Sequence, residues 1–366
     1  MTFTPLHFRD VRIDVLRGSA LLIMILDHIW ENPVRDFMPI SLGFSDMAEA
    51  FFFLSGYVCG IAYGRRLAER GFWACQRRAC WRALQLYAVN LLMIGVFIVV
   101  IRDLNDRYPA FASATGGYRV ARVLGSPIAC LPQLLRLEVE PIVLAVLPFY
   151  IVMLFLVPAL LLLCRFSRTI TIFQSIGAYA AVQIFPETIA LPEPWRSAWF
   201  FNPFAWQLVF VAGAVFGTRA PQPPRWLSRG VTAPILAAIA LETAFLVMMV
   251  YELSWIPYVG KANLEVLRLA HFAAVLVVAI RFLPRHDDLF WKSRSLAPFA
   301  TCGRNSLATY CAGALIATFG SLTFAIYGFG APVIAAVNST SVSASFVAAW
   351  IWQSLKRIFG DKRTSK

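Results

Sequence analysis

One apolar segment near the start of the chain carries polar side chains at a spacing that could do chemistry. Residues 12–30 are mostly apolar but include Asp14, Arg17 and His28. Arg17 and His28 are eleven residues apart, close to three helical turns, so they share one helix face about 16 Å apart along its axis. A guanidinium binds anions and an imidazole accepts a proton near neutral pH. This face therefore suits a long anionic ligand whose reactive end lies near His28.

Simpler structural roles remain open for both side chains. Arg17 could extend its guanidinium to the lipid headgroups, and His28 could hydrogen-bond a neighbouring helix. Polar groups inside an apolar helix are costly, however, and usually face a cavity or a partner. Arg17 and His28 are therefore candidate functional residues.

More polar side chains lie at the ends of three other apolar segments. They are Asp46 and Glu49, Asn202 and Gln207, and Lys261, Arg268 and His271. We expect them on the outer side of the membrane with His28, as a chemical and acceptor site. A second, cationic set should lie at the inner side with Arg17, and its members are Arg77, Arg78, Arg82 and Arg304. Guanidinium groups bind phosphates by paired hydrogen bonds, although cations at an inner edge also serve as ordinary topology anchors.

The elements that position these groups are predicted to be transmembrane helices. Of the 366 residues, 59% are hydrophobic and 14% charged, with a mean hydropathy of +0.66, which excludes a soluble globular enzyme. A transmembrane helix needs about 20 apolar residues, and about ten such spans can be drawn. The ranges are 12–30, 46–64, 83–101, 141–164, 169–186, 199–217, 231–252, 264–283, 300–321 and 331–354. We therefore expect one all-α, polytopic membrane domain over residues 1–366.

The distribution of positive charge predicts the orientation. Most Lys and Arg residues fall in the loops on the side of the N-terminus, so both termini should be cytoplasmic. This distribution also explains the net charge of +13 without nucleic-acid binding. The one long connection, residues 102–140, contains an apolar-basic stretch that could lie along the outer interface. The seven cysteines form no C-x-x-C pair, and the His and carboxylate residues lack metal-ligand spacing, so neither a disulfide nor a metal site is expected.

Several motifs resemble a known family. Arg17-x10-His28, Ser-Gly-Tyr at 55–57 and the basic run QRRACWRALQLY at 76–87 resemble the membrane acyltransferase-three superfamily. Further blocks resemble its OpgC branch, which succinylates osmoregulated periplasmic glucans. In order they are DHIWEN at 27–32, SDMAEAFFFLSGYVCG at 45–60, VLPFYIVMLFLVP at 146–158, FNPFAWQLVF at 201–210, KANLEVLRLAHF at 261–272 and CGRNSLATY at 302–310. One departure is Gln85-Leu-Tyr87, where the superfamily usually has Pro-x-Tyr.

The resemblance implies an O-acyltransferase that moves an acyl group from cytoplasmic acyl-CoA to a hydroxyl of an envelope glucan or other carbohydrate. It implies that His28 is the general base, with Arg17 as its partner. Donor binding would fall to the residues matching the Ser-Gly motif and the basic run, namely Ser55, Arg77, Arg78 and Arg82. Acyl-CoA, with succinyl-CoA as one candidate, would be a co-substrate, with no permanently bound cofactor, in a bacterial inner membrane.

Several residues keep two interpretations. If the acyl group is a dicarboxylic one, Arg268 or Lys261 could bind its free carboxylate, but Arg268 could equally pair with Glu49 or Asp46. Glu49 could orient His28 or form such a pair. Ser55 could bind the donor, or Ser55 and Gly56 could together provide a close contact between helices.

Two other functions are also compatible with the intramembrane charges. One is a transporter or flippase of an envelope lipid or glycan precursor, although no repeat halves or paired interrupted helices are visible. The other is a non-catalytic sensor or assembly subunit. The oligomeric state, and the choice between direct transfer and an acyl-enzyme, are open.

Overall fold

The structure, a computed structural model, describes residues 10–109, 111, 121–189, 191–219, 232–250, 260–285 and 288–361, and their regular structure is entirely helical. The α-helices are α1 (Val11–Asp27), α2 (Pro39–Leu42), α3 (Met47–Arg107), α5 (Ala121–Gly125), α6 (Leu131–Leu135), α7 (Val146–Phe166), α8 (Arg168–Ile184), α9 (Trp195–Ala198), α10 (Pro203–Gly217), α11 (Thr232–Val250), α12 (Val266–Phe282), α13 (Ala297–Arg304), α14 (Ser306–Tyr327) and α15 (Ala331–Asp361). Short 3-10 helices are η1 (Pro33–Phe37), η3 (Ile142–Leu144), η5 (Leu289–Lys292) and η6 (Arg294–Leu296). The predicted all-α class is confirmed for these residues.

Each predicted apolar range overlaps a long helix, and α3 contains two of the ranges. Within the described part of the chain, five helices are long and apolar enough to cross a membrane on length and composition. They are Met47–Arg107, Ile142–Phe166, Thr232–Met249, Ser306–Tyr327 and Ala331–Phe359. The count of ten crossings and the cytoplasmic location of the termini stay predictions.

Large apolar side chains face outward on α3, α8 and α15. Val99, Phe173 and Trp350 are 69, 67 and 64% exposed, and only 6% of the apolar stretch of α11 is buried against the rest of the protein. Apolar surface of this extent is unfavourable in water and favourable in lipid. The described helices therefore form a membrane protein.

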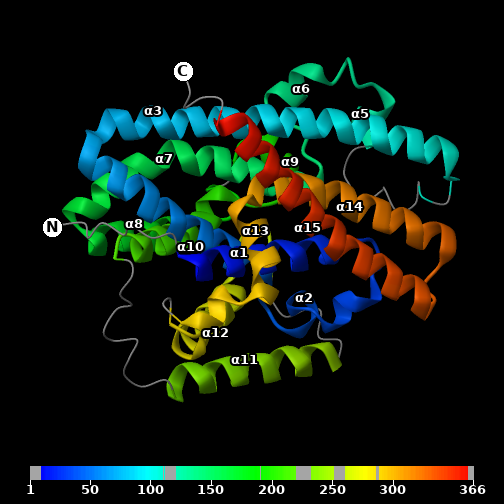
Figure 1. The fold of residues 1–366 in the computed structure, drawn as a ribbon. Coiled ribbons are helices and arrows are strands. Elements are labelled where there is room, and N and C mark those ends of the chain that lie inside the picture. Colours follow the sequence, from blue (N-terminus) through cyan, green and yellow to red (C-terminus); the bar gives the residue numbers. More distant parts are fainter. Residues whose placement is uncertain are drawn as a thin grey trace.

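Helix α3 consists of two straight segments that meet at Gly71, where the chain doubles back (Figure 1). Gly71 has φ 76° and ψ 177°, a conformation open to glycine because it has no Cβ. Residues 65–82, which the apolar pattern assigned to a connecting loop, are helical apart from this position. The charged side chains there end the apolar run. They do not end the helix, because a helix is stable in water as well as in lipid.

Close glycine contacts hold α3 against α10. A Cβ at Gly56 or Gly60 would overlap the carbonyl groups of Phe210 or Ala214, and one at Gly213 or Gly217 would overlap carbonyl groups of α3. Glycine pairs at i and i+4 on both helices thus let the two backbones touch. The predicted close contact at Gly56 is confirmed.

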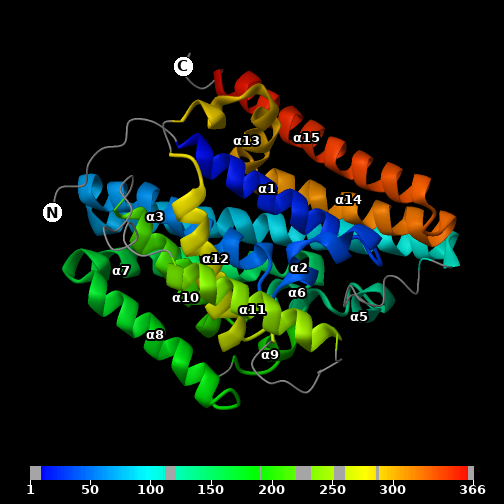
Figure 2. The same cartoon turned by 90° about the horizontal axis from the view of Figure 1, so that it is seen from below.

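Helix α1 lies in the middle of the bundle. It packs on α3, α13 and α14, and Figure 2 shows α13, α14 and α15 along one side of it with α3, α10 and α12 along the other. Gly18 of α1 and Gly303 of α13 each lie against the backbone of the facing helix. The predicted span 300–321 is divided by Asn305, at φ −111° and ψ 34°, into α13 and α14.

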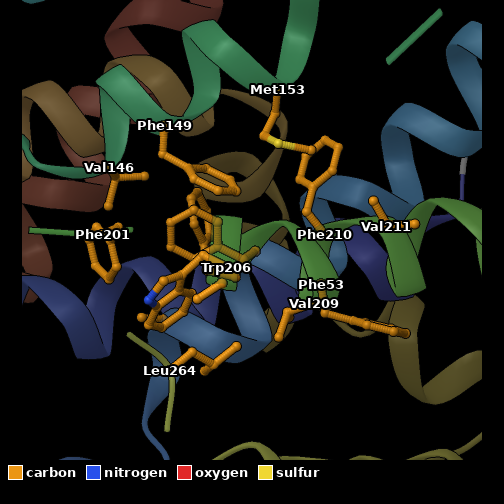
Figure 3. Packing of buried hydrophobic residues seen from close by; sticks show 14 of the residues in the cluster. Phe53, Val146, Phe149, Met153, Phe201, Trp206, Val209, Phe210, Val211 and Leu264 are labelled. Carbon is orange, nitrogen blue, oxygen red and sulfur yellow. The ribbon is translucent and has the colours of Figure 1, made fainter. Parts of the chain in front are cut away.

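An aromatic core joins α3, α7 and α10 (Figure 3). Phe52, Phe149 and Trp206 are fully buried, and the Phe52 ring lies 4.5 Å from Phe149 and 4.9 Å from Trp206, centre to centre. The Trp206 indole N–H donates to the carbonyl of Lys261, which fixes the start of the segment leading to α12. The core therefore positions both α3 and Lys261, where the polar residues lie.

Candidate active site

His28 is the residue that ends α1. Its Nδ1 lies 2.6 Å from the carbonyl oxygen of Met24. A carbonyl oxygen can only accept, so Nδ1 carries the proton and a neutral ring has its lone pair on Nε2. The side chain is half-buried. The helix end therefore fixes His28 in the tautomer that can act as a base through Nε2.

Arg17 lines a cavity of about 180 Å³ between α1, α3, α7 and α14. Ser55 and Arg82, from the two segments of α3, line the same cavity, as do the phenol groups of Tyr150 and Tyr310. The Arg17 guanidinium lies over the Phe51 ring, 5.8 Å from its centre. Three residues predicted to act near the donor, far apart in the sequence, therefore meet in one cavity.

The other two predicted donor residues lie outside this cavity. Arg77 and Arg78 are exposed on the second segment of α3, near Gly71. The charges of Arg78 and Arg82 both act on Tyr63, which lines the cavity. Arg78 is thus near Tyr63 at the edge of the cavity, although neither Arg77 nor Arg78 is among the residues that line it.

A buried charge network joins the start of α3 to α12. The Arg268 guanidinium donates to Glu49 at 2.7 and 3.0 Å and to Asp46 at 3.0 Å, and the Lys261 ammonium lies 2.7 Å from Asp46. Glu49 is fully buried and Arg268 is 8% exposed. Two cations thus balance two carboxylates.

The carboxylates of this network are placed by the first turn of α3. Asp46 accepts the backbone N–H of Ala48, and Glu49 accepts the backbone N–H of Asp46, which together form a capping box. Glu49 was expected either to orient His28 or to pair with Arg268. It contacts Arg268 and not His28, so the structure shows the ion pair.

His28 lies close to this network. The charges of Asp46, Lys261 and Arg35 all act on His28 and on its neighbour Asp27. Asp46 and Lys261 are therefore near His28, while the outer location and acceptor role expected for this group stay predictions. Gln207 is placed elsewhere, because its amide contacts Ser175 of α8, at 2.6 and 2.8 Å.

His271 contacts two residues that sequence reasoning missed. Its Nδ1 lies 2.7 Å from the Ser45 hydroxyl, and its Nε2 lies 2.9 Å from Glu242 of α11. Glu242 is the one charged residue of α11, and a charged residue in an apolar span is a signal of function that could have identified it. Ser45 gave no such signal.

Two further buried carboxylates lie away from His28. Asp14 binds Arg304 of α13 at 3.2 Å, so the inner cation Arg304 has a partner on α1. Glu140, before η3, accepts from the Asn90 amide at 3.1 Å and is 2% exposed. Among the described residues, no group of three or more His, Cys, Asp and Glu side chains is placed to hold a metal ion.

The chain was compared with known proteins and protein families. No curated protein and no solved structure matches the chain. The family model described as OpgC protein matches residues 9–357, nearly the whole length and including every site residue above. The chain therefore belongs to the OpgC protein family.

Proposed function

We propose that this protein is a membrane O-acyltransferase of the acyltransferase-three superfamily, which moves an acyl group from cytoplasmic acyl-CoA to a hydroxyl of an envelope glucan or related carbohydrate. Membership of the OpgC family supports a glucan-modifying acyltransferase. Ten membrane crossings, cytoplasmic termini and a location in the bacterial inner membrane belong to the same proposal. The apolar helices and the uneven distribution of Lys and Arg support these points.

The observation that carries the proposal is the placement of His28 and Arg17 on α1. The Met24 carbonyl holds the His28 proton on Nδ1, so Nε2 is available as a base. Three turns away, Arg17 and Arg82 bring two guanidinium groups to one cavity. One helix thus joins an anion-binding cavity to a proton acceptor.

The donor would bind with its phosphates at the cavity mouth. Arg82 and Arg17 would pair with phosphate oxygens, with Arg78 at the entrance, while Ser55 would lie beside the pantetheine arm. This flexible arm places the thioester far from the phosphates. The acyl carbon could therefore move along α1 toward His28 while the nucleotide stays at the inner side.

In direct transfer, His28 Nε2 would remove the proton of the acceptor hydroxyl as its oxygen attacks the thioester carbonyl. The tetrahedral intermediate then collapses, the carbon–sulfur bond breaks, and the CoA thiolate takes the proton from the His28 imidazolium. The new ester leaves on the carbohydrate.

A dicarboxylic acyl group such as succinyl would need a cation near His28. Arg268 is engaged by both Glu49 and Asp46 and its side chain is 10% exposed, whereas the Lys261 side chain is 24% exposed and pairs with Asp46. Lys261 is therefore the better candidate to bind the acyl carboxylate. His271 and Gln207 are weaker candidates, because His271 contacts Ser45 and Gln207 contacts Ser175.

The test uses purified protein in lipid vesicles with labelled acyl-CoA and a periplasmic glucan. Wild-type protein should label the glucan, and His28→Ala should not, with unchanged insertion. Movement of an intact glycan or lipid across the vesicle without labelling would contradict the proposal and favour a transporter or flippase. Comparison of glucan masses from cells with and without the protein identifies the acyl group.

A further inference from the structure

Two polar side chains from separate parts of the chain meet at one imidazole. The Ser45 hydroxyl lies 2.7 Å from His271 Nδ1, and Glu242 Oε1 lies 2.9 Å from His271 Nε2. Ser45 precedes α3, His271 lies on α12 and Glu242 on α11. A hydroxyl, an imidazole and a carboxylate joined in this order are the parts of a serine nucleophile with its base and orienting acid.

The proton positions in this cluster follow from its hydrogen bonds. The backbone N–H of Ser45 points at His271 Nδ1, at 3.1 Å. An amide N–H can only donate, so Nδ1 is an acceptor and the neutral ring carries its proton on Nε2, facing Glu242. The lone pair of Nδ1 therefore faces Ser45, and the Ser45 hydroxyl donates to it. His271 is in the tautomer that can take the proton of Ser45.

The surroundings bury His271 and Ser45, whereas the Glu242 side chain is 41% exposed. His271 is 3% exposed and Ser45 is 7% exposed. A Cβ at Gly43 would overlap the His271 ring and crowd the Glu242 carboxylate, so only glycine fits between the chain and this pair. Phe44 places its ring edge-on to His271, 6.3 Å away. Low exposure strengthens hydrogen bonds between charged and polar groups.

We propose that Ser45, His271 and Glu242 form a nucleophilic triad that carries the acyl group as an ester on the Ser45 oxygen before transfer to the acceptor. This inference rests on the proposed function. His271 Nδ1 takes the Ser45 proton, the oxygen attacks the thioester carbonyl, and the carbon–sulfur bond breaks. The CoA thiolate leaves and takes the proton from the His271 imidazolium. Glu242 keeps the ring oriented and stabilises its positive charge.

The neighbouring charge network has a part in both halves of this reaction. Lys261 binds Asp46, the residue after Ser45, and its ammonium would be the nearby cation for the oxyanion that forms on the thioester carbonyl. The charge of Asp46 also acts on His28, which places His28 near Ser45. In the second half, His28 would remove the proton of the acceptor hydroxyl as its oxygen attacks the acyl carbon. The ester bond to Ser45 then breaks, and the Ser45 oxygen takes the proton from the His28 imidazolium.

The test is acyl-enzyme trapping with the full-length protein. Purified protein is mixed with labelled acyl-CoA without acceptor, quenched in acid, digested and analysed by mass spectrometry. We expect one acyl group on Ser45 and a burst of free CoA equal to the enzyme concentration. His28→Ala should still give the burst and the label but no glucan product.

Three variants separate a nucleophile from a structural contact. Ser45→Ala should abolish the burst and lower glucan acylation about 10³-fold. Ser45→Cys should keep a burst and carry the label as a thioester, and the nearby Ser41→Ala should behave as wild type. Unlabelled Ser45 in wild-type protein that acylates glucan would overturn the triad and leave the proposed function intact. A wild-type protein that acylates no glucan at all would overturn the proposed function itself.

Discussion

The Arg268 guanidinium donates twice to Glu49, from a terminal nitrogen at 2.7 Å and from Nε at 3.0 Å, so one buried cation ties α12 to the start of α3. A third hydrogen bond, to Asp46, extends the same link. Buried charges are stable only when they are paired and hydrogen-bonded. The position of α12, and with it His271, therefore depends on Arg268.

Arg268→Gln should destabilise the protein by about 3–5 kcal/mol, because it leaves the buried Glu49 carboxylate without its main cation. Thermal unfolding in detergent measures the loss. The exposed Arg294→Gln is the matched control and should shift the midpoint little. An Arg268→Gln midpoint equal to that of wild type would show that the network does not hold α12.

Apolar length was sufficient to predict where the long helices lie, because a lipid-exposed helix needs a continuous apolar run. It did not predict the helical conformation of residues 65–82, since charge ends the apolar run without ending the helix. The division at Asn305 was also missed, because a local change of backbone direction leaves no mark in apolar content.

The site shows a similar division between local and long-range information. Helical periodicity placed Arg17 and His28 on one helix, which the structure confirms. The pairing of Glu49 with Arg268, and the meeting of Arg17 with Ser55 and Arg82, involve residues far apart in the chain. Such contacts depend on which helix faces come together, and a single sequence does not specify that.

His28→Asn tests the base without removing the helix-end hydrogen bond. An Asn side chain can still donate to the Met24 carbonyl, but it has no basic nitrogen in the place of Nε2. Glucan acylation should fall by a factor of about 10² to 10⁴, the range for loss of a general base, with an unchanged unfolding midpoint. Acylation at the wild-type rate would remove His28 from the chemistry. His271→Gln serves as the comparison and, unlike His28→Asn, should lower the CoA burst as well.

Arg82→Gln tests the cavity as the donor site. Loss of one guanidinium–phosphate contact should raise the KM for acyl-CoA about tenfold, equivalent to about 1.4 kcal/mol, with little change in kcat. Arg77→Gln should have a smaller effect, because Arg77 does not line the cavity. The exposed Arg357→Gln is the control for lost charge alone. Equal KM values for wild type and Arg82→Gln would place the donor elsewhere.

Gly56→Ala tests the contact between α3 and α10. The added methyl group would overlap the Phe210 carbonyl, so the helices must separate and the protein should lose about 1–3 kcal/mol of stability. Gly95→Ala, in the second segment of α3, meets no atom within 4 Å and should be neutral or stabilising. Equal stability of the two variants, measured by thermal unfolding, would contradict the close contact.

Glu140→Gln should change how stability depends on pH. Burial raises the pKa of Glu140 well above its ordinary value of 4.5, and the hydrogen bond from Asn90 offsets only part of this rise. A raised pKa means that the folded state favours the neutral acid. The contribution of Glu140 to the free energy of unfolding is therefore complete below about pH 4.5 and is lost as the pH rises through the folded-state pKa. The amide of the variant has no proton to lose, so the variant should become more stable relative to wild type as the pH rises. The exposed Glu69→Gln is the control and should leave the dependence of stability on pH unchanged. Parallel stability profiles for wild type and Glu140→Gln would show that Glu140 is ionised in the folded protein.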